Sequence, residues 1–145
     1  MHYDNHNIFA KILRGELTCV KVLESKKVLA FMDFMPEADG HVLVVPKEAV
    51  AEIFDLSDIA GAICFHTIRR VAIAVRAALK PEGILVTQLN GVAAGQTVPH
   101  VHFHVIPRRA DEKLKPYKRT IAKLGKLESI AQLIRIQLEQ SSELI

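Results

Sequence analysis

Tryptophan is absent from this 145-residue chain, and aromatic residues make up only 6% of it. Valine, isoleucine, leucine and alanine must therefore supply most of the packing. They are abundant enough to do so, because 50% of the residues are hydrophobic and 24% are charged. This balance excludes an intrinsically disordered chain. The length suits one domain, and we expect a single domain over residues 1–145.

Cysteine is scarce, and targeting signals are missing. Cys19 and Cys64 stand far apart in no paired spacing, whereas a small secreted domain usually carries more cysteines. No apolar run approaches the ~20 residues that a bilayer span needs. Residues 1–5 lack the basic and apolar regions of a signal peptide. We therefore expect buried thiols in a reducing compartment, a cytoplasmic location and no membrane partner.

A strong charge of one sign is also missing. The formal net charge is +3, which is too small to indicate a nucleic-acid partner. Much of the positive excess lies in one stretch, made of Arg108, Arg109, Lys113, Lys115, Lys118, Arg119, Lys123 and Lys126. We interpret this stretch as a solvated face, which is compatible with a basic rim that attracts anionic ligands.

The hydrophobic pattern predicts an α+β domain. Helical spacing covers residues 8–14, 57–79 and 127–138, and the second of these helices has Ser57 as its N-cap. Strand patterns cover residues 19–24, 27–34, 41–46, 84–90 and 100–106, with Pro107 ending the last. Because consecutive strands are separated by short gaps, we expect an antiparallel meander with the long helix packed on it.

Three histidines alternate with apolar residues along the last predicted strand. Alternate side chains of a strand share a face, so the spacing predicts that His100, His102 and His104 line one face. Their Cα atoms would be roughly 7 Å apart, since a strand rises ~3.3 Å per residue. Three imidazoles in a row are not needed for folding, and we interpret the row as functional.

A row of imidazoles has two main uses. Zinc binds several neutral histidines, and His-x-His on a strand is a known ligand spacing, with His41 as a further candidate. Alternatively, a neutral imidazole attacks phosphorus, because its pKa lies near neutrality. The preceding Gly95-Gln96-Thr97 turn offers backbone N–H groups, an amide and a hydroxyl to a phosphate. This turn favours the second use.

The residues that carry this chemistry also resemble a known family. The segment 95–108, GQTVPHVHFHVIPR, is similar to the signature of the histidine-triad superfamily, His-x-His-x-His with hydrophobic x. Residues 8–12 resemble its N-terminal helix, and residues 30–36 and 40–47 resemble its central strands. The resemblance covers residues 7–109 and leaves 110–145 as a helical extension. It implies the histidine-triad fold and a twofold homodimer that pairs the long helix and a strand across the axis.

The resemblance implies a covalent mechanism. His102 would be the nucleophile and form a nucleotidyl-imidazole, which water then hydrolyses. His104 would contact phosphate oxygens or the leaving group, and His100 and His41 would form the supporting hydrogen-bond shell. Asp33 would accept hydrogen bonds from the ribose hydroxyls, for which a carboxylate is well suited. The remaining implied contacts are Gly95, Gln96 and Thr97 with the phosphate, and Ile8, Phe9, Ile12, Phe31 and Phe34 with the base.

Departures from the family pattern refine these expectations. Leu89 stands where the family usually has Asn or Gln near the phosphate, and we expect Asn90 to take over that contact. Asn7 and Ala10 stand where some bacterial members carry a zinc-binding Cys-x-x-Cys, so we expect no zinc there. His104 is present where hexose-phosphate uridylyltransferases have Gln, which favours hydrolysis over transfer.

We therefore predict a hydrolase of nucleoside 5′-phosphoryl compounds, either dinucleoside polyphosphates or nucleoside phosphoramidates, with adenine or guanine as the base. No cofactor and no catalytic metal are expected, although Mg²⁺ can accompany a polyphosphate. Two alternatives stay open. One is a zinc-dependent hydrolase with His100, His102 and His104 as ligands. The other is a nucleotide-binding or scaffold protein with little turnover, which Leu89 favours.

Overall fold

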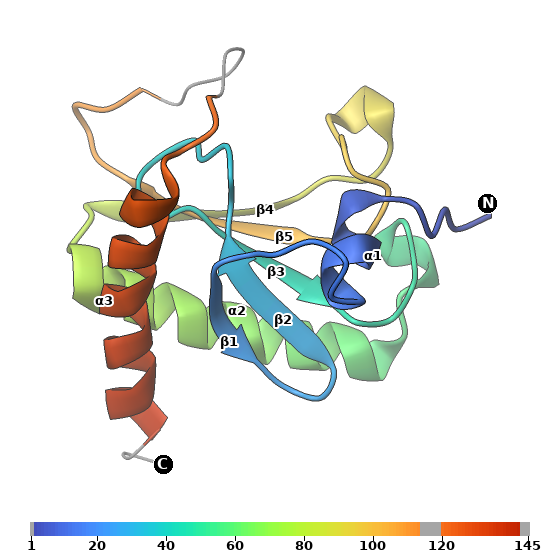
Figure 1. Ribbon diagram of the computed structural model, residues 1–145, viewed down its shortest axis with the longest axis horizontal. Helices are drawn as coiled ribbons and strands as arrows, with labels where there is room; N and C mark the ends of the chain where they lie inside the picture. The colour runs from blue at the N-terminus through green and yellow to red at the C-terminus, as the bar shows by residue number, and fades with distance from the viewer. Residues whose placement is uncertain (1, 114–119, 143–145) are drawn as a thin grey trace.

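The computed structural model describes residues 2–113 and 120–142. It contains a five-stranded antiparallel sheet. Helices lie on both faces of this sheet (Figure 1). The elements are α1 (Ile8–Leu13), β1 (Lys21–Glu24), β2 (Val28–Met32), β3 (Val42–Pro46), the 3₁₀ turn η1 (Ile53–Asp55), α2 (Asp58–Leu79), β4 (Gly83–Gln88), η2 (Val92–Ala94), β5 (Phe103–Arg108) and α3 (Leu124–Ser142). The α+β expectation is confirmed. Within the described residues, no helix is both long and apolar enough to cross a membrane.

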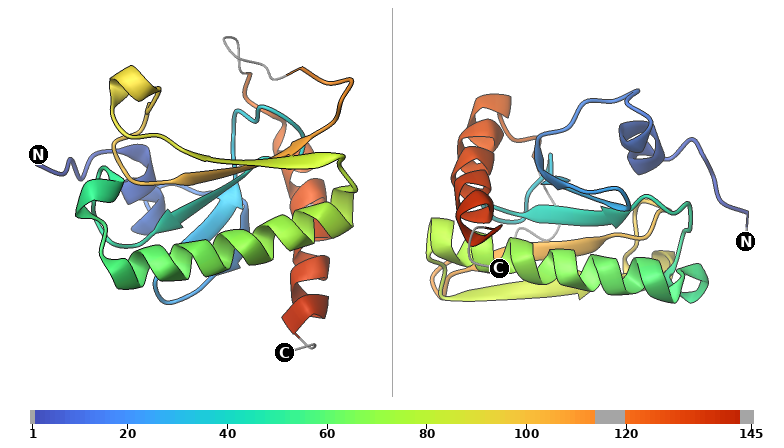
Figure 2. Two further views of the ribbon diagram at one scale, coloured as in Figure 1. Left: turned by 180° about the vertical axis from the view of Figure 1, so that it is seen from behind. Right: turned by 90° about the horizontal axis from the view of Figure 1, so that it is seen from below.

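The sheet lies between α1 on one side and α2 and α3 on the other (Figure 2), and it separates two apolar layers. Alternate residues of the strands, such as Val42 and Val44, pack with α2 and α3 on one face. The residues between them, such as Leu43 and Val45, pack with Phe9 of α1 on the other. This is why β2 and β3 are buried at every position and read as continuous apolar runs. The α1 face is the one that carries the candidate site.

The long helix begins and ends where the sequence predicts. The Ser57 side chain accepts a hydrogen bond from the Ala60 N–H at 3.2 Å, which caps α2. Lys80 follows the helix in the left-handed region at φ 52°. The Arg109 guanidinium donates to the Leu79 carbonyl at 2.6 Å and satisfies one of the free carbonyls at this end. Part of the basic stretch is thus structural, while Lys115, Lys118 and Arg119 lie outside the described residues.

The meander expectation is wrong for the second half of the sheet. Strands β1, β2 and β3 are consecutive neighbours, but the full order is β1-β2-β3-β5-β4. The 22 residues of α2 span roughly 33 Å at 1.5 Å per residue and carry the chain across the sheet. Strand β4 therefore forms the far edge, and β5 returns between β3 and β4. This insertion places the histidine segment next to the centre of the sheet.

The predicted strand 100–106 is also shifted. Strand β5 begins at Phe103 and continues through Pro107, which lies opposite Ile84 of β4. On its other side β5 pairs with β3 only between Phe103 and Val105. Pro107 lies beyond that paired stretch, where a missing backbone N–H is tolerated. Of the three histidines, only His104 is in the strand.

Gly40, just before His41, allows the turn into β3 to pack against the end of α2. Its φ is +95°, and a Cβ atom there would lie 2.3 Å from Leu79 Cδ1 and 3.1 Å from Pro107 Cγ. We expect Gly40→Ala to destabilise the protein by about 1–3 kcal/mol, because backbone strain and overpacking combine. Urea unfolding measures this. Gly83→Ala, whose Cβ would meet no atom within 4 Å, is the control, and equal losses for both variants would contradict the explanation.

Candidate active site

The histidines open into a small cleft of about 80 Å³ on the α1 face of the sheet. We call it the histidine cleft, and its lining residues are Ile8, Phe9, Asp33, Phe34, Met35, Leu43, Thr97, Val98, His102 and His104. A larger cavity of about 590 Å³ lies between α2 and β4, away from these residues. The concentration of buried polar groups, and not the volume, identifies the histidine cleft as the candidate site.

The ring of His102 is fixed in one tautomer. Its Nδ1 lies 2.6 Å from the backbone carbonyl oxygen of His100. A carbonyl only accepts hydrogen bonds, so Nδ1 carries the proton and Nε2 of the neutral ring carries the lone pair. The edge-on rings of Phe9 and His104, with centroids 4.8 and 5.0 Å away, hold the imidazole in place. His102 is thus prepared to attack an electrophile through Nε2.

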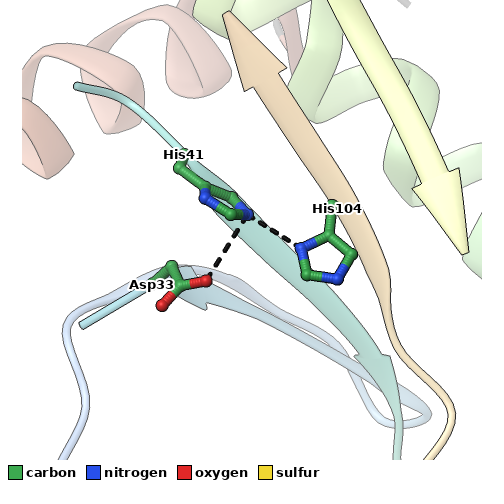
Figure 3. A group of neighbouring side chains, drawn as sticks. All are labelled: Asp33, His41 and His104. Atoms are coloured by element: carbon green, nitrogen blue, oxygen red, sulfur yellow. Dashed lines mark hydrogen bonds and ion pairs between the residues drawn. The ribbon is translucent and has the colours of Figure 1, made fainter. Parts of the chain in front are cut away.

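Two further imidazoles and a carboxylate, those of His41, His104 and Asp33, form a hydrogen-bonded relay (Figure 3). The Glu37 N–H donates to His41 Nδ1 at 3.0 Å, which places the ring proton of neutral His41 on Nε2. That Nε2 lies 2.9 Å from His104 Nδ1 and 3.4 Å from Asp33 Oδ2. His104 therefore accepts at Nδ1 and carries its own proton on Nε2. The relay turns His104 into a hydrogen-bond donor for an anionic ligand.

Asp33, His41 and His104 are also the one group of potential metal ligands found among the described residues, with ligand atoms within 4.8 Å of one another. A metal binds a deprotonated ring nitrogen. His41 would have to move its proton from Nε2 to Nδ1, where it would face the Glu37 N–H. The local hydrogen bonds therefore fit a proton-bearing relay better than a metal centre.

His100 lies outside β5 and does not line the histidine cleft, although the Phe9 ring packs near both His100 and His102, so the expectation of a single row along one strand is corrected. It lies in a bend before β5, where its N–H donates to the Val98 carbonyl. Its ring is 1% exposed, with Nε2 2.8 Å from the Pro46 carbonyl oxygen and Nδ1 against the Tyr3 hydroxyl. Burial lowers the pKa of His100, so the ring stays neutral. His100, His102 and His104 consequently do not converge as a zinc site.

The apolar residues assigned to the base pocket divide into two groups. Ile8, Phe9 and Phe34 line the histidine cleft, and Ile8 is 44% exposed. Ile12 and Phe31 are buried in the core beneath the histidine cleft. They support the cleft and do not form its walls, which corrects the expectation for these two residues. Met35, Leu43 and Val98 also line the cleft and were not predicted. Leu43 could have been predicted from the sequence, because it alternates along β3 with residues that face the core on the other side of the sheet.

The Gln96 amide has a different role from the predicted one. Its Nε2 donates to the Ala51 and Val98 carbonyl oxygens at 2.7 and 3.0 Å, and its Oε1 accepts from the Gly91 N–H at 2.7 Å. Both amide protons are used by backbone carbonyls, one within the loop and one at Ala51, so Gln96 ties the loop to that segment and does not offer the amide protons to a phosphate. Gly95 ends η2 at φ +97°, and Thr97 lines the cleft.

Asn90 does not replace the amide that Leu89 lacks. Its Nδ2 donates to Gln88 Oε1 at 2.7 Å, and its Oδ1 accepts from Gln88 Nε2 and from the Ile53 N–H. These bonds tie the end of β4 to η1, and Asn90 is not part of the cleft lining. The expected phosphate contact of Asn90 is therefore revised. Sequence spacing did not reveal this because the partner Ile53 lies 37 residues away.

A family model described as "HIT domain" matches residues 14–111 of the chain. Among curated proteins, adenosine 5′-monophosphoramidase hnt1 of Schizosaccharomyces pombe is 43% identical over 105 residues, which cover 72% of this chain and 76% of that protein.

Solved structures agree over nearly the whole fold. A Hit-like protein of Bartonella henselae, described as involved in cell-cycle regulation and solved with an unknown ligand, superposes with a TM-score of 0.87 at 40% identity, covering 94% of this chain and 99% of that one. A Zn-bound histidine triad family protein of Mycobacterium smegmatis has a TM-score of 0.85 at 30% identity, covering 97% and 98%.

Proposed function

This chain belongs to the HIT domain family, and on that premise we propose that it hydrolyses nucleoside 5′-phosphoryl compounds through a covalent nucleotidyl-His102 intermediate. The observation that carries the proposal is the His102 tautomer, because the His100 carbonyl leaves the lone pair on Nε2. The S. pombe relative is named an adenosine 5′-monophosphoramidase, and this name supports a phosphoramidate bond to adenosine monophosphate as the substrate. A dinucleoside polyphosphate is the other substrate class to test.

In the first step, His102 Nε2 forms a bond to the α-phosphorus while the bond from phosphorus to the leaving group breaks. The leaving group departs with the bonding electron pair, and an amine takes its proton from solvent. The positive charge on the nucleotidyl-imidazole is stabilised at Nδ1–H by the His100 carbonyl 2.6 Å away. The Nε2–H of His104 donates to a phosphoryl oxygen, where negative charge develops.

In the second step, water attacks the same phosphorus and the bond from phosphorus to Nε2 breaks. The electron pair returns to Nε2, and the excess proton passes to solvent. Two displacements, each with a good leaving group, replace one difficult hydrolysis. Asp33, with Oδ1 held by the Met35 N–H at 2.9 Å, is oriented to accept from the ribose hydroxyls.

The test is a substrate panel on the purified protein, with adenosine 5′-phosphoramidate, guanosine 5′-phosphoramidate and diadenosine polyphosphates. We expect release of the nucleoside monophosphate from at least one phosphoramidate. Binding of AMP without turnover of any compound would favour the alternative, a nucleotide-binding protein. The observation that favours this alternative is that the side-chain amides of Gln96 and Asn90 form hydrogen bonds within the protein and are not offered to a phosphate.

We also propose that the chain forms the twofold homodimer implied by its family. Strand β4 is an edge strand, and its Val86 is 47% exposed. Phe65 of α2 is 69% exposed, and Ile73 lies in the cavity between α2 and β4. Apolar groups along an edge strand and a helix fit a contact with a second copy. Light scattering after gel filtration measures the mass, and a monomer at micromolar concentration would contradict this proposal.

Removal of metal is expected to leave activity unchanged within about twofold, because the proposed chemistry uses only imidazoles and a carboxylate. The measurement is the rate of phosphoramidate hydrolysis after dialysis against a chelator, with and without added Zn²⁺. A large loss that Zn²⁺ restores would instead favour a catalytic metal at Asp33, His41 and His104.

A further inference from the structure

We propose that Tyr3 is a positioning residue for His102 and acts through the ring of His100. Tyr3 lies 97 residues from His100 in sequence, yet its hydroxyl is hydrogen-bonded to His100 Nδ1. Its ring packs edge-on against the same imidazole, with the centroids 5.6 Å apart at 69°. The kinetic part of this inference rests on the proposed function, whereas the tautomer of His102 is measurable without it.

The direction of the Tyr3 hydrogen bond follows from the other side of the His100 ring. His100 Nε2 lies 2.8 Å from the Pro46 carbonyl oxygen, which can only accept, so the proton is on Nε2. Nδ1 is then an acceptor in a ring that is 1% exposed. The Tyr3 hydroxyl donates to it and keeps its own proton, because burial raises the pKa of Tyr3.

His100 is in turn what orients the nucleophile. Its carbonyl oxygen receives the Nδ1–H of His102, and this bond places the lone pair of His102 on Nε2. The His100 ring is held on one side by Pro46 of β3 and on the other by Tyr3. If the Tyr3 side is lost, a buried acceptor is left unpaired and the His100 ring loses one of its two hydrogen bonds, which weakens the hold on the residue that supplies the carbonyl.

The N-terminal segment that carries Tyr3 is itself fixed to α1. Asn7 caps the helix by accepting from the Ala10 N–H at 2.9 Å, and its amide donates to the Asp4 carbonyl at 2.7 Å. Asn7 also contacts the Tyr3 hydroxyl, which lowers the Tyr3 pKa in opposition to burial. Phe9, one turn further, packs on the His102 ring. Residues 3–9 thus contact both His100 and His102.

The test is Tyr3→Phe, which removes the hydroxyl and keeps the ring. We expect kcat for the phosphoramidate to fall about 10-fold while KM changes less than about twofold, since the nucleotide contacts are untouched. Histidine ¹⁵N spectra should show the Nδ1–H form of His102 in the wild type and a mixture of tautomers in the variant. The pKa of His100 should rise, because the donor to its neutral ring is gone.

The control is His6→Ala, in the same segment, whose side chain is 87% exposed. It should match the wild type in kcat and in the histidine spectra. An unchanged His102 tautomer and an unchanged kcat in Tyr3→Phe would overturn the positioning role. If the wild type shows no turnover, the proposed function is contradicted, but the positioning role of Tyr3 is not. The histidine spectra would then decide the role of Tyr3. Thermal unfolding of both variants verifies that the fold is intact.

Discussion

His102→Ala should lose turnover by about 10³-fold or more, because the group that forms the covalent bond is removed. The variant should still bind AMP, since the proposed contacts to the ribose and the base come from Asp33, Phe9 and Phe34. The fold should also persist, because the hydrogen bond from His102 Nδ1 goes to the carbonyl of a residue two positions away and does not join distant segments. Single-turnover kinetics and calorimetric titration with AMP measure the two effects separately.

The covalent intermediate offers an independent readout of the same residue. Acid quench of the wild type during turnover should trap a nucleotidyl group on the protein, and peptide mass spectrometry should locate it on His102. The variant should trap none, and the exposed His6→Ala control should behave as the wild type. Turnover by His102→Ala within tenfold of the wild type would refute the assignment, as would a trapped adduct on His104.

Asp33→Ala should remove the preference for ribonucleotides over 2′,3′-dideoxynucleotides. A hydrogen bond to a charged acceptor contributes about 1.5–3 kcal/mol, so the preference should fall by roughly 10- to 100-fold. The Asp33 side chain is 12% exposed, and its carboxylate is oriented by the Met35 N–H and by His41. Because Oδ2 also contacts His41, Asp33→Ala should lower kcat in addition to weakening binding.

The matched control for this prediction is Asp39→Ala. Asp39 is six positions along the chain, but its carboxylate is exposed and pairs with Lys126 at 3.2 Å, outside the histidine cleft. It should leave both the affinity and the ribose preference unchanged. If Asp33→Ala binds AMP and 2′,3′-dideoxy-AMP in the wild-type ratio, the ribose assignment is wrong.

Local sequence patterns correctly predicted the structural features that depend on neighbouring residues in the chain. The cap at Ser57, the end of α2 before Pro81 and the strand nature of residues 42–46 all follow from propensity and periodicity. The HxHxH spacing identified the chemistry, and His102, His104, His41 and Asp33 do meet. The resemblance supplied Asp33 and the supporting role of His41, which had otherwise been only a candidate zinc ligand.

The errors have a common physical origin in contacts between distant segments. The amide of Gln96 was expected at a phosphate, but Ala51, 45 residues away, accepts from it. His100 was expected on the face of a strand, but the Pro46 carbonyl and Tyr3 draw its ring into the interior. The hydrophobic periodicities of a strand (two residues) and of a helix (3.6 residues) do not reveal such contacts, because the contacts depend on which segments become neighbours after the sheet has formed.

The amino-acid order alone determines the α+β class, the extent of the long helix and the residue types available for catalysis, since these depend on interactions within a few residues. The folded arrangement decides where β5 inserts, which nitrogen of each imidazole carries the proton, and which polar side chains face the cleft. Many of those properties arise from hydrogen bonds between residues 37 to 97 positions apart, although the tautomers of His102 and His41 are set by the backbone of His100 and Glu37, two and four positions away. Packing of the sheet brings those groups within bonding distance, and burial makes each unpaired donor or acceptor costly enough to select one arrangement.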